Sequence, residues 1–433
     1  MSTVYFKDLE ITFADSIVLL DIDGTIVFDS QDDIDGSYDK VQEIKKKNNR
    51  IFLCSNTPDQ ERVKRLSKQL GVDYIATPHQ KPSTKMIKGS KLQDASREIM
   101  IVIGDKLITD GWFAKRLRVS FIKVKRLVSE RDSALTKLVH RFDDALFWLA
   151  IHVFPYIRLA RPHHWIKNVL VFAPLFFAGS FFNVYKLIPG IYLFVAFSLL
   201  ASAIYILNDI RDRYEDSMHP IKKSRPIASG NISVARAVVM MIVLLGIGGL
   251  LLFSFPVGTQ AVLGGYVLLN VLYSFWLKHK PIVDIFMVAF MYVLRIYAGG
   301  TFFAIELSVW IILCTFFLAL FLVIAKRRSE YNALGKNASR KVMHLYNNAF
   351  LDHMLTISTT FCLMSYSFYL VSFGNTPLIF AFFFVLFGIM RYLYLVYRYN
   401  LGESPEIIVI KDPWMLISIV AWILYNTYFL YYY

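Results

Sequence analysis

Hydrophobic residues are distributed unevenly along the 433-residue chain. Up to about residue 150, short apolar runs alternate with polar stretches, as in an ordinary soluble α/β domain. From about residue 165 onward, long apolar runs follow one another with only short polar gaps between them. Because a helix needs about 20 apolar residues to cross a bilayer, this pattern predicts a soluble domain followed by an all-α, polytopic membrane domain.

Nine segments of the second part have roughly the length and apolar character of a membrane span. They are residues 168–185, 187–207, 237–256, 259–277, 281–303, 307–325, 354–373, 376–397 and 413–432. The gaps between them alternate between strongly basic stretches, such as "KRRSEYNALGKNASRK", and stretches that together contain a single lysine, Lys186. Basic loops stay on the cytoplasmic side, so we expect the basic gaps and the N-terminal domain to lie there.

A connecting segment separates the two parts of the chain. Residues 141–160, "RFDDALFWLAIHVFPYIRLA", mix apolar and charged residues in the way expected of an amphipathic helix lying on the membrane surface. We therefore predict a soluble domain over residues 1–140, an interfacial connector over 141–164 and a membrane domain over 165–433. The first residues, "MSTVYFKDLEITFADS", do not have the pattern of a signal peptide.

Composition supports the same division. Hydrophobic residues make up 56% of the chain, more than in soluble domains. Residues 1–150 carry a net charge of +3 and the remainder +11, so most of the basic excess belongs to the membrane part. The three cysteines match neither a metal-binding spacing nor a disulfide framework. The lipid bilayer is the expected partner, and no nucleic-acid partner is expected.

Polar residues follow the strand-like runs of the soluble domain. "IVLLDIDGT", residues 17–25, is an apolar run that ends in Asp21 and Asp23. The carboxyl ends of parallel strands are where open α/β sheets bind ligands, and two carboxylates there can act as nucleophile and general acid. Further polar residues follow in "RIFLCSNT", "HQKPSTK" and "IMIVIGDKLITD", namely Ser55, Asn56, Lys81, Asp105 and Asp110.

These motifs, in this order, resemble those of the haloacid dehalogenase (HAD) phosphohydrolases over roughly residues 15–125, closest to small members that act on phospholipid phosphates (the YqeG-like group). The resemblance implies that Asp21 accepts the phosphoryl group and Asp23 protonates the leaving oxygen. It also implies phosphate binding by Ser55, Asn56 and Lys81. The implied Mg²⁺ ligands are Asp21, Asp23, Asp105 and Asp110. The alternative is a Rossmann-like scaffold without chemistry, which four ordered motifs make the weaker hypothesis.

The membrane part has one concentration of acidic residues, in "NDIRDRYED". On a continued helix, Asn208, Asp212 and Asp216 recur every four residues and share a face, which Asp209 borders. Oxygen ligands in this arrangement suit Mg²⁺. The cations Lys222 and Arg225 follow and would suit phosphate oxygens. On these residues alone, a solvated helix end with intrahelical ion pairs is about equally well supported.

The wider pattern, "NDxxDxxxD" followed by "HPxKxxRPIASG", resembles the UbiA superfamily of intramembrane prenyltransferases over about residues 155–433. Most members carry a second Asp-rich motif on a later helix. This chain has "YSFWLKHKPIVDIFM" there, with Asp284 alone and with Tyr273 and Lys278 in place of a second acidic pair.

That departure matches the branch of decaprenyl-phosphate phosphoribosyltransferases, as do "RPHHWIKN", "KRRSE" and "ESPEIIVIKDPW". The resemblance implies that phosphoribosyl pyrophosphate (PRPP) is the diphosphate substrate, that Mg²⁺ grips its pyrophosphate, and that a polyprenyl phosphate attacks C1 of the ribose. Asp212 and Asp209 are the catalytic candidates of this site, and Asp209 is either a metal ligand or the group that positions the lipid phosphate. The phosphate-binding candidates are Arg161, Lys167, Asn168, Lys222, Arg225, Tyr273 and Lys278.

Arg295 lies inside the fifth predicted span, where a charge is costly. A functional role and a purely structural pairing are equally open for it.

The two resemblances together imply a bifunctional enzyme of a bacterial-type plasma membrane. The membrane domain would make a polyprenyl-phosphoryl ribose that still carries a 5-phosphate, and the HAD domain would remove that phosphate, yielding a precursor for cell-wall arabinan. The alternatives are an aromatic prenyltransferase, or a lipid-binding or transport protein with a regulatory HAD-like domain. Whether the chain forms a homo-oligomer is left open.

Overall fold

The computed structural model describes residues 3–28, 32–34, 36–87, 92, 99–129, 133–219, 222–334, 345–374, 376–400, 402, 408 and 411–432. The chain forms two compact units, Met1–Phe154 and Pro155–Tyr433. Each unit is described by itself.

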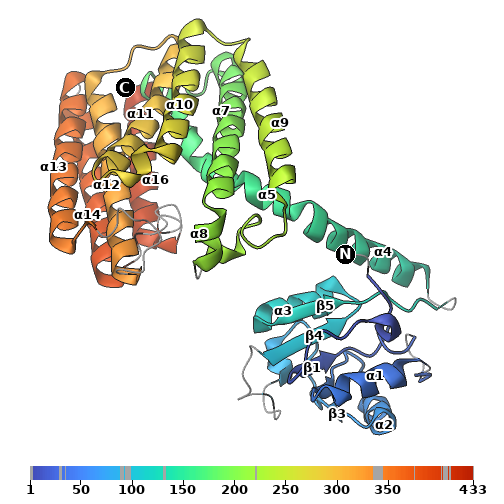
Figure 1. The fold of residues 1–433 in the computed structure, drawn as a ribbon. Coiled ribbons are helices and arrows are strands. Elements are labelled where there is room, and N and C mark those ends of the chain that lie inside the picture. Colours follow the sequence, from blue (N-terminus) through green and yellow to red (C-terminus); the bar gives the residue numbers. More distant parts are fainter. Residues whose placement is uncertain are drawn as a thin grey trace. The chain divides into compact units, whose positions relative to one another are not determined.

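The first unit is built on a five-stranded parallel sheet (Figure 1). Its strands, in the spatial order β3-β2-β1-β4-β5, are β3 (Asp73–Tyr74), β2 (Arg50–Leu53), β1 (Ile17–Leu20), β4 (Met100–Gly104) and β5 (Ser120–Lys123). Strand β1 lies at the centre, with Leu20 paired to Leu53 of β2 and to Ile103 of β4. All four residues of β1 are buried, which explains why its sequence is a continuous apolar run.

Helices cover both faces of this sheet. Helices α1 (Ser37–Lys46) and α2 (Gln60–Leu70) pack on one face, and α3 (Trp112–Leu117) packs on the other. Short helical turns complete the unit at η1 (Phe6–Asp8), η2 (Thr84–Ile87) and η4 (Leu107–Gly111). The predicted Rossmann-like α/β class is confirmed, and the parallel order brings the carboxyl ends of β1, β2 and β4 to one edge.

Helix α4 (Ala134–His152) follows the sheet, and α5 (Phe154–Ala160) comes directly after it. The break between the two helices falls just before Pro155, which cannot donate the hydrogen bond that a continuing helix needs. The surface of α4 is unusual for a helix of a soluble domain. Its large apolar side chains are exposed, while its buried residues are polar, His140 and Asp143. The exposed apolar residues are Leu135, Leu138, Val139, Phe142, Trp148, Leu149 and Ile151.

The second unit is all-helical (Figure 1). Its long helices are α7 (Val184–Arg211), α9 (Val234–Leu252), α10 (Val257–Phe275), α11 (Val283–Phe303), α12 (Val309–Leu334), α13 (Asn348–Ser372), α14 (Ala381–Tyr399) and α16 (Pro413–Tyr431). Shorter elements are η5 (Pro162–Phe172), α6 (Ala173–Phe177), α8 (Arg213–Met218), η6 (Lys222–Ser224), η7 (Leu277–His279) and η10 (Thr376–Phe380). Within the described part of the chain, seven helices are long and apolar enough to cross a membrane. The predicted multi-pass membrane domain is thereby confirmed, with an approximate span count.

Two of the nine predicted spans are not among these seven. Helix α10 has the required length but contains polar Gln260 and Asn270. The predicted segment 168–185 is instead the end of η5, followed by α6, and the helical structure stops at Phe177. A turn follows at Gly179, whose φ of 62° lies in the left-handed region that glycine adopts without strain. Apolar composition alone did not reveal this turn.

The two largest hydrophobic cores of the membrane unit share one helix. One is formed between η5, α7, α10 and α11, around Phe197 and Tyr266. The other is formed between α11, α12, α13 and α14, around Phe321 and Tyr392. Helix α11 contributes to both cores, so its position determines how the two groups of helices meet.

Candidate active sites

Three carboxylates converge at the carboxyl edge of the sheet. Asp21 follows β1, while Asp105 and Asp110 follow β4, and each offers an oxygen within 4.8 Å of the others. All three residues are buried, and the Thr25 hydroxyl donates to Asp105 at 3.4 Å. Buried carboxylates so close together repel one another unless cations join them. Oxygen donors of this kind suit Mg²⁺, so the trio fits the expected metal.

Lys81 supplies one such cation. Its ammonium group contacts both Asp21 and Asp110 and is itself almost fully buried. Burial raises the pKa of Asp21 well above its usual range and Asp110 adds to the rise, while Lys81 opposes it. Burial alone would lower the pKa of Lys81, but Asp110 and Asp21 outweigh burial and raise it. The lysine therefore stays charged and offers a fixed cation to a phosphate.

Asp23 lies outside this trio and has different partners. Its carboxylate accepts hydrogen bonds from Ser55 Oγ (3.2 Å) and from Arg62 Nη1 (2.8 Å). Asn56 Oδ1 accepts from the Lys81 backbone N–H at 2.6 Å. Asn56 thus joins the loop after β2 to the segment that carries the buried lysine. The expected phosphatase residues are therefore close together, although Asp23 pairs with an arginine rather than with the other acids.

Arg126 and Asp143, like Arg62 and Thr25, belong to this site but were not predicted from the sequence. Arg126 binds the Asp105 carboxylate, and its Nη2 lies 3.5 Å from Asp143. Asp143, on α4, accepts hydrogen bonds from the backbone N–H groups of Leu107 (3.0 Å) and Ile108 (2.8 Å). It thereby caps η4, the turn that carries Asp110. A basic residue just after the fifth strand is a signal that could have revealed Arg126, but nothing local marks Asp143.

The acidic stretch of the membrane unit lies where α7 ends and α8 begins. Asp212 stands between the two helices, yet the helical hydrogen bonds continue, from Asp212 N to Asn208 O (2.9 Å) and from Asp216 N to Asp212 O (2.8 Å). The helical course is thus maintained through Asn208, Asp212 and Asp216, as the expected shared face requires. Asp209 and Asp216 are buried, whereas the side chain of Asp212 is 30% exposed.

Each of the three aspartates in this stretch is paired with a cation from a distant element. Arg225 Nη1 lies 3.1 Å from Asp209 and 2.5 Å from Asp216, joining the two. Arg161, just before η5, also binds Asp209. Lys278, in η7, lies 2.5 Å from Asp212. The alternative explanation of these acids was ion pairs within one helix. Among the described side chains, the aspartates instead pair with cations outside their own helix. The carboxylates suit a divalent cation and the bases suit phosphates.

The remaining predicted phosphate-binding residues lie on η5, η6 and α10. Lys167 in η5 and Lys222 in η6 are partly buried, and Tyr273 packs against the core formed with α7. Asn168 lies deeper, because its Nδ2 donates to Ser198 Oγ (3.0 Å) and its Oδ1 accepts from Arg295 Nε (2.9 Å).

Asn168 is the partner of Arg295 that the sequence did not identify. Arg295 is buried and also donates to the Tyr266 hydroxyl (3.1 Å) and the Met291 carbonyl (2.6 Å). The Phe197 ring lies 5.3 Å from its guanidinium carbon. Neutral hydrogen-bond acceptors and aromatic rings therefore stabilise this charge.

Asp284, which stands in place of a second acidic motif, is enclosed by other groups. Its Oδ1 accepts from the Tyr346 hydroxyl (2.8 Å), and its Oδ2 lies 3.3 Å from Arg327 Nη2. Arg327 belongs to the "KRRSE" motif and also pairs with Glu330 at 3.2 Å. Most of the other quoted motif, "ESPEIIVIKDPW", lies outside the described residues.

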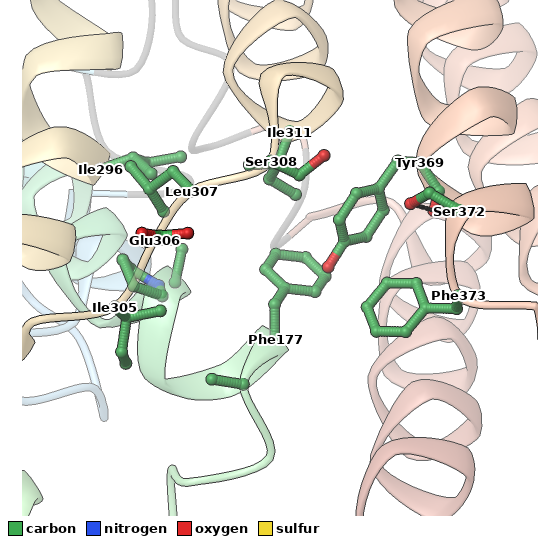
Figure 2. A pocket seen from close by; sticks show the side chains of 13 residues that line it. Phe177, Ile296, Ile305, Glu306, Leu307, Ser308, Ile311, Tyr369, Ser372 and Phe373 are labelled. Carbon is green, nitrogen blue, oxygen red and sulfur yellow. Dashed lines mark hydrogen bonds between the residues drawn. The ribbon is translucent and has the colours of Figure 1, made fainter.

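A cavity of about 190 Å³ lies in the membrane unit at the Phe303 end of α11. Figure 2 shows Tyr369, Ser372 and Phe373 on one side of it and Ile305 and Glu306 on the other. None of the aspartates discussed above lines this cavity.

Profiles of two known protein families match the two parts of the chain. The profile of the UbiA prenyltransferase family matches residues 168–411, and that of the mitochondrial PGP phosphatases matches residues 5–128. A decaprenyl-phosphate phosphoribosyltransferase from Corynebacterium glutamicum is 38% identical over 217 residues, covering 49% of this chain and 65% of that protein. One from Mycobacterium tuberculosis is 33% identical over 277 residues, covering 62% of this chain and 91% of that protein.

Solved structures show the same fold. A UbiA homolog from Archaeoglobus fulgidus bound to GPP and Mg²⁺ superposes with a TM-score of 0.51 at 20% identity, covering 63% of this chain and 98% of that one. At this level of identity the likeness concerns the fold of the membrane unit.

Proposed function

The chain belongs to the UbiA prenyltransferase family, and we propose that its membrane unit transfers 5-phosphoribose from PRPP to a polyprenyl phosphate. The chain is an enzyme with a transferase domain and an N-terminal HAD-like phosphatase domain. The proposal adds that the phosphatase domain then removes the 5-phosphate, giving a polyprenyl-phosphoryl ribose for cell-wall arabinan. Both sites are proposed to face the cytoplasm of a bacterial-type plasma membrane.

One observation carries the choice of PRPP over a prenyl diphosphate. Where a second set of metal-binding acids would be expected, the chain has Lys278 paired with Asp212, and Asp284 is held by Arg327 and Tyr346. A lysine is suited to hold a phosphate group. PRPP carries a 5-phosphate in addition to its pyrophosphate, and this additional phosphate can bind the extra cation. A prenyl diphosphate has no such additional phosphate.

In the proposed transfer, the bond between C1 of the ribose and the pyrophosphate oxygen breaks, and a phosphate oxygen of the lipid bonds to C1. Asn208, Asp212 and Asp216 would hold Mg²⁺, which when bound supplies positive charge to the leaving pyrophosphate. Arg225 and Lys278 separate from their carboxylate partners and bind phosphate oxygens of the substrate instead. Asp209, buried beside Arg161 and Arg225, positions the lipid phosphate or takes part in holding the metal.

In the proposed phosphatase step, Asp21 attacks the phosphorus atom and the bond to the sugar oxygen breaks. Asp23 donates a proton to that oxygen, and water later releases phosphate from Asp21. Lys81 and Ser55 bind the phosphoryl oxygens. Asp21, Asp105 and Asp110 are the carboxylates that would hold Mg²⁺ here. Tethering both sites in one chain raises the local concentration of the phosphorylated lipid at the second site.

The test supplies the purified full-length chain with Mg²⁺, polyprenyl phosphate and PRPP labelled in the ribose. Label is expected in the lipid phase, on a lipid that no longer carries the 5-phosphate. The Asp21→Asn variant should transfer label at the same rate but accumulate the 5-phosphorylated lipid.

Two outcomes would contradict the proposal. Label that stays in the aqueous phase, together with reaction of a prenyl diphosphate and an aromatic acid, would favour the aromatic prenyltransferase. Equal loss of the 5-phosphate by the wild type and by Asp21→Asn would refute the proposed phosphatase role of the HAD-like domain.

A further inference from the structure

The backbone is strained at Ile282, just after the segment that carries Lys278. Ile282 has a φ of 66° and a ψ of −47°, close to a classic γ-turn, and the Val283 N–H donates to the Pro281 carbonyl at 2.7 Å, which closes that turn. Such turns are rare, and a positive φ is unusual for a β-branched residue. The Ile282 side chain is 43% exposed, so its burial does little to offset the strain. Surrounding contacts must therefore hold the turn.

The Tyr346 hydroxyl provides such a contact. It accepts a hydrogen bond from the Ile282 backbone N–H at 2.6 Å and donates one to Asp284 Oδ1 at 2.8 Å. Asp284 is buried, and its other oxygen lies 3.3 Å from Arg327 Nη2. Tyr346 comes from the segment before α13 and is itself buried in the core that α11, α12, α13 and α14 form. Its hydroxyl thus connects the strained turn to an anchored carboxylate in the interior.

The turn at Ile282 joins α11 to η7, the short element that carries Lys278. At the end of η7, the Lys280 N–H donates to the Leu277 carbonyl at 3.1 Å. The Lys280 carbonyl in turn accepts from the Asp284 N–H, in the first turn of α11, at 3.0 Å. Backbone hydrogen bonds therefore run from η7 into α11 across the strained turn. A change in the turn would consequently move η7 and its lysine.

The segment before η7 is held from α7. Arg211, in the last turn of α7, donates to the Phe275 carbonyl at 3.1 Å and also to the Ser274 carbonyl, both at the end of α10. Arg211 directly precedes Asp212, the carboxylate that pairs with Lys278. Contacts on both sides of η7 thus determine where the lysine lies relative to the acidic stretch. Such double anchoring suits a group that must meet a ligand at a fixed position.

We infer that Tyr346 is a positioning residue for Lys278: its hydroxyl holds the turn at Ile282 and thereby keeps the lysine beside Asp212, where it can bind a phosphate of PRPP. The inference rests on the proposed transferase function and adds a residue that acts through the lysine rather than on the substrate. A purely structural role, in which the hydroxyl only stabilises the start of α11, would affect both substrates alike.

The experiment compares Tyr346→Phe with Tyr425→Phe in the purified full-length chain, by transfer of labelled ribose into the lipid phase. Tyr346→Phe should raise KM for PRPP about tenfold, because Lys278 is no longer held in place, and should leave KM for the polyprenyl phosphate unchanged. Tyr425 on α16 is the matched control, since its hydroxyl donates to the Pro377 carbonyl in η10 at 2.7 Å. Its loss removes one hydrogen bond of the same kind and should leave both KM values unchanged.

Two double variants separate positioning from stability. In a Lys278→Met background, Tyr346→Phe should raise KM for PRPP by less than about twofold, because the lysine that it positions is gone. In a Tyr346→Phe background, Ile282→Gly should bring KM for PRPP back toward the wild-type value, since glycine adopts a positive φ without strain. Val283→Gly, the control at the next position, should not restore it.

Unchanged or equally changed KM values for the two substrates, additive effects of Tyr346→Phe and Lys278→Met, or no recovery with Ile282→Gly would overturn the inference. A wild type that transfers no label would instead refute the proposed transferase function. In that case, thermal unfolding in detergent still tests the turn. A smaller loss of Tm from Tyr346→Phe in an Ile282→Gly background than in the wild type supports the role of the hydroxyl, and an equal loss refutes it.

Discussion

Lys278 Nζ lies 2.5 Å from Asp212 Oδ1, although 66 positions separate the two residues in the chain. The lysine comes from η7, just after α10, and the aspartate from the junction of α7 and α8. The pair places a cation directly beside a carboxylate proposed to bind metal. The membrane site therefore contains its own positive charge before any substrate arrives.

Replacing this lysine should weaken use of PRPP. We expect Lys278→Met to lower kcat/KM for PRPP by roughly 10- to 100-fold, since a hydrogen bond to a charged group contributes about 1.5–3 kcal/mol. The measurement is transfer of labelled ribose into the lipid phase. Lys280→Met, two residues away and exposed, is the control and should remain near the wild type. Equal activity of both variants would show that Lys278 does not bind the substrate.

Asp143 should contribute stability that depends on pH. Burial acts to raise the pKa of Asp143, but hydrogen bonds from Ile108, Leu107 and Lys123 outweigh burial and hold the pKa below its usual range. A carboxyl with a depressed folded-state pKa stabilises the fold above its unfolded pKa of about 3.9 and loses this effect as pH falls through the folded value. Asp143→Asn should therefore lower the free energy of unfolding of the first unit by about 2 kcal/mol at pH 7.

The difference between wild type and Asp143→Asn should shrink as the pH falls below about 4. Urea unfolding followed by circular dichroism at pH 7 and below pH 4 measures it. The control is Asp144→Asn, whose exposed carboxylate lies 2.9 Å from Lys123. An exposed ion pair contributes about 1 kcal/mol or less, so this variant should change little. A difference for Asp143→Asn that stays constant with pH would contradict the explanation.

The apolar surface of α4 is expected to lie in the membrane interface. A spin label at Phe142, on the exposed apolar face, should be accessible to oxygen dissolved in the bilayer of a nanodisc. A label at Asp144, whose side chain is also exposed but which lies about 200° around the helix, should be accessible to a water-soluble relaxation agent. Aqueous accessibility at both positions would refute membrane contact by this helix.

Gly299 allows α11 to approach η5 closely. A Cβ atom at this position would collide with the backbone carbonyl of Val171, which cannot move aside as a flexible side chain could. We expect Gly299→Ala to destabilise the membrane unit by about 1–3 kcal/mol, as overpacking does. Thermal unfolding in detergent measures the change. Gly265→Ala, where an added Cβ meets nothing within 4 Å, should be neutral or slightly stabilising, and equal destabilisation by both would contradict the packing argument.

Part of the phosphatase site was predictable because its residues follow strands. Asp21, Ser55 and Asp105 each come just after an apolar run, and parallel strands bring their carboxyl ends to one edge. The pairing of Asp23 with Arg62 was not predictable, since Arg62 lies on helix α2 and its direction depends on how that helix packs. Asp143 was also missed, because its role comes from docking of α4 beside η4.

The sequence by itself determined the order of the two domains, the α/β class of the first and the membrane character of the second. These properties follow from local patterns, namely apolar run length, the residues that end each run and the four-residue spacing of Asn208, Asp212 and Asp216. Only the tertiary structure decided which charges meet. Arg225 pairs with Asp209 across 16 positions and with Asp216 across 9, and Arg295 donates to Asn168 across 127 positions. Such pairings depend on helix packing between distant segments, where burial forces each charge to find a partner, and that requirement leaves no local pattern in the chain.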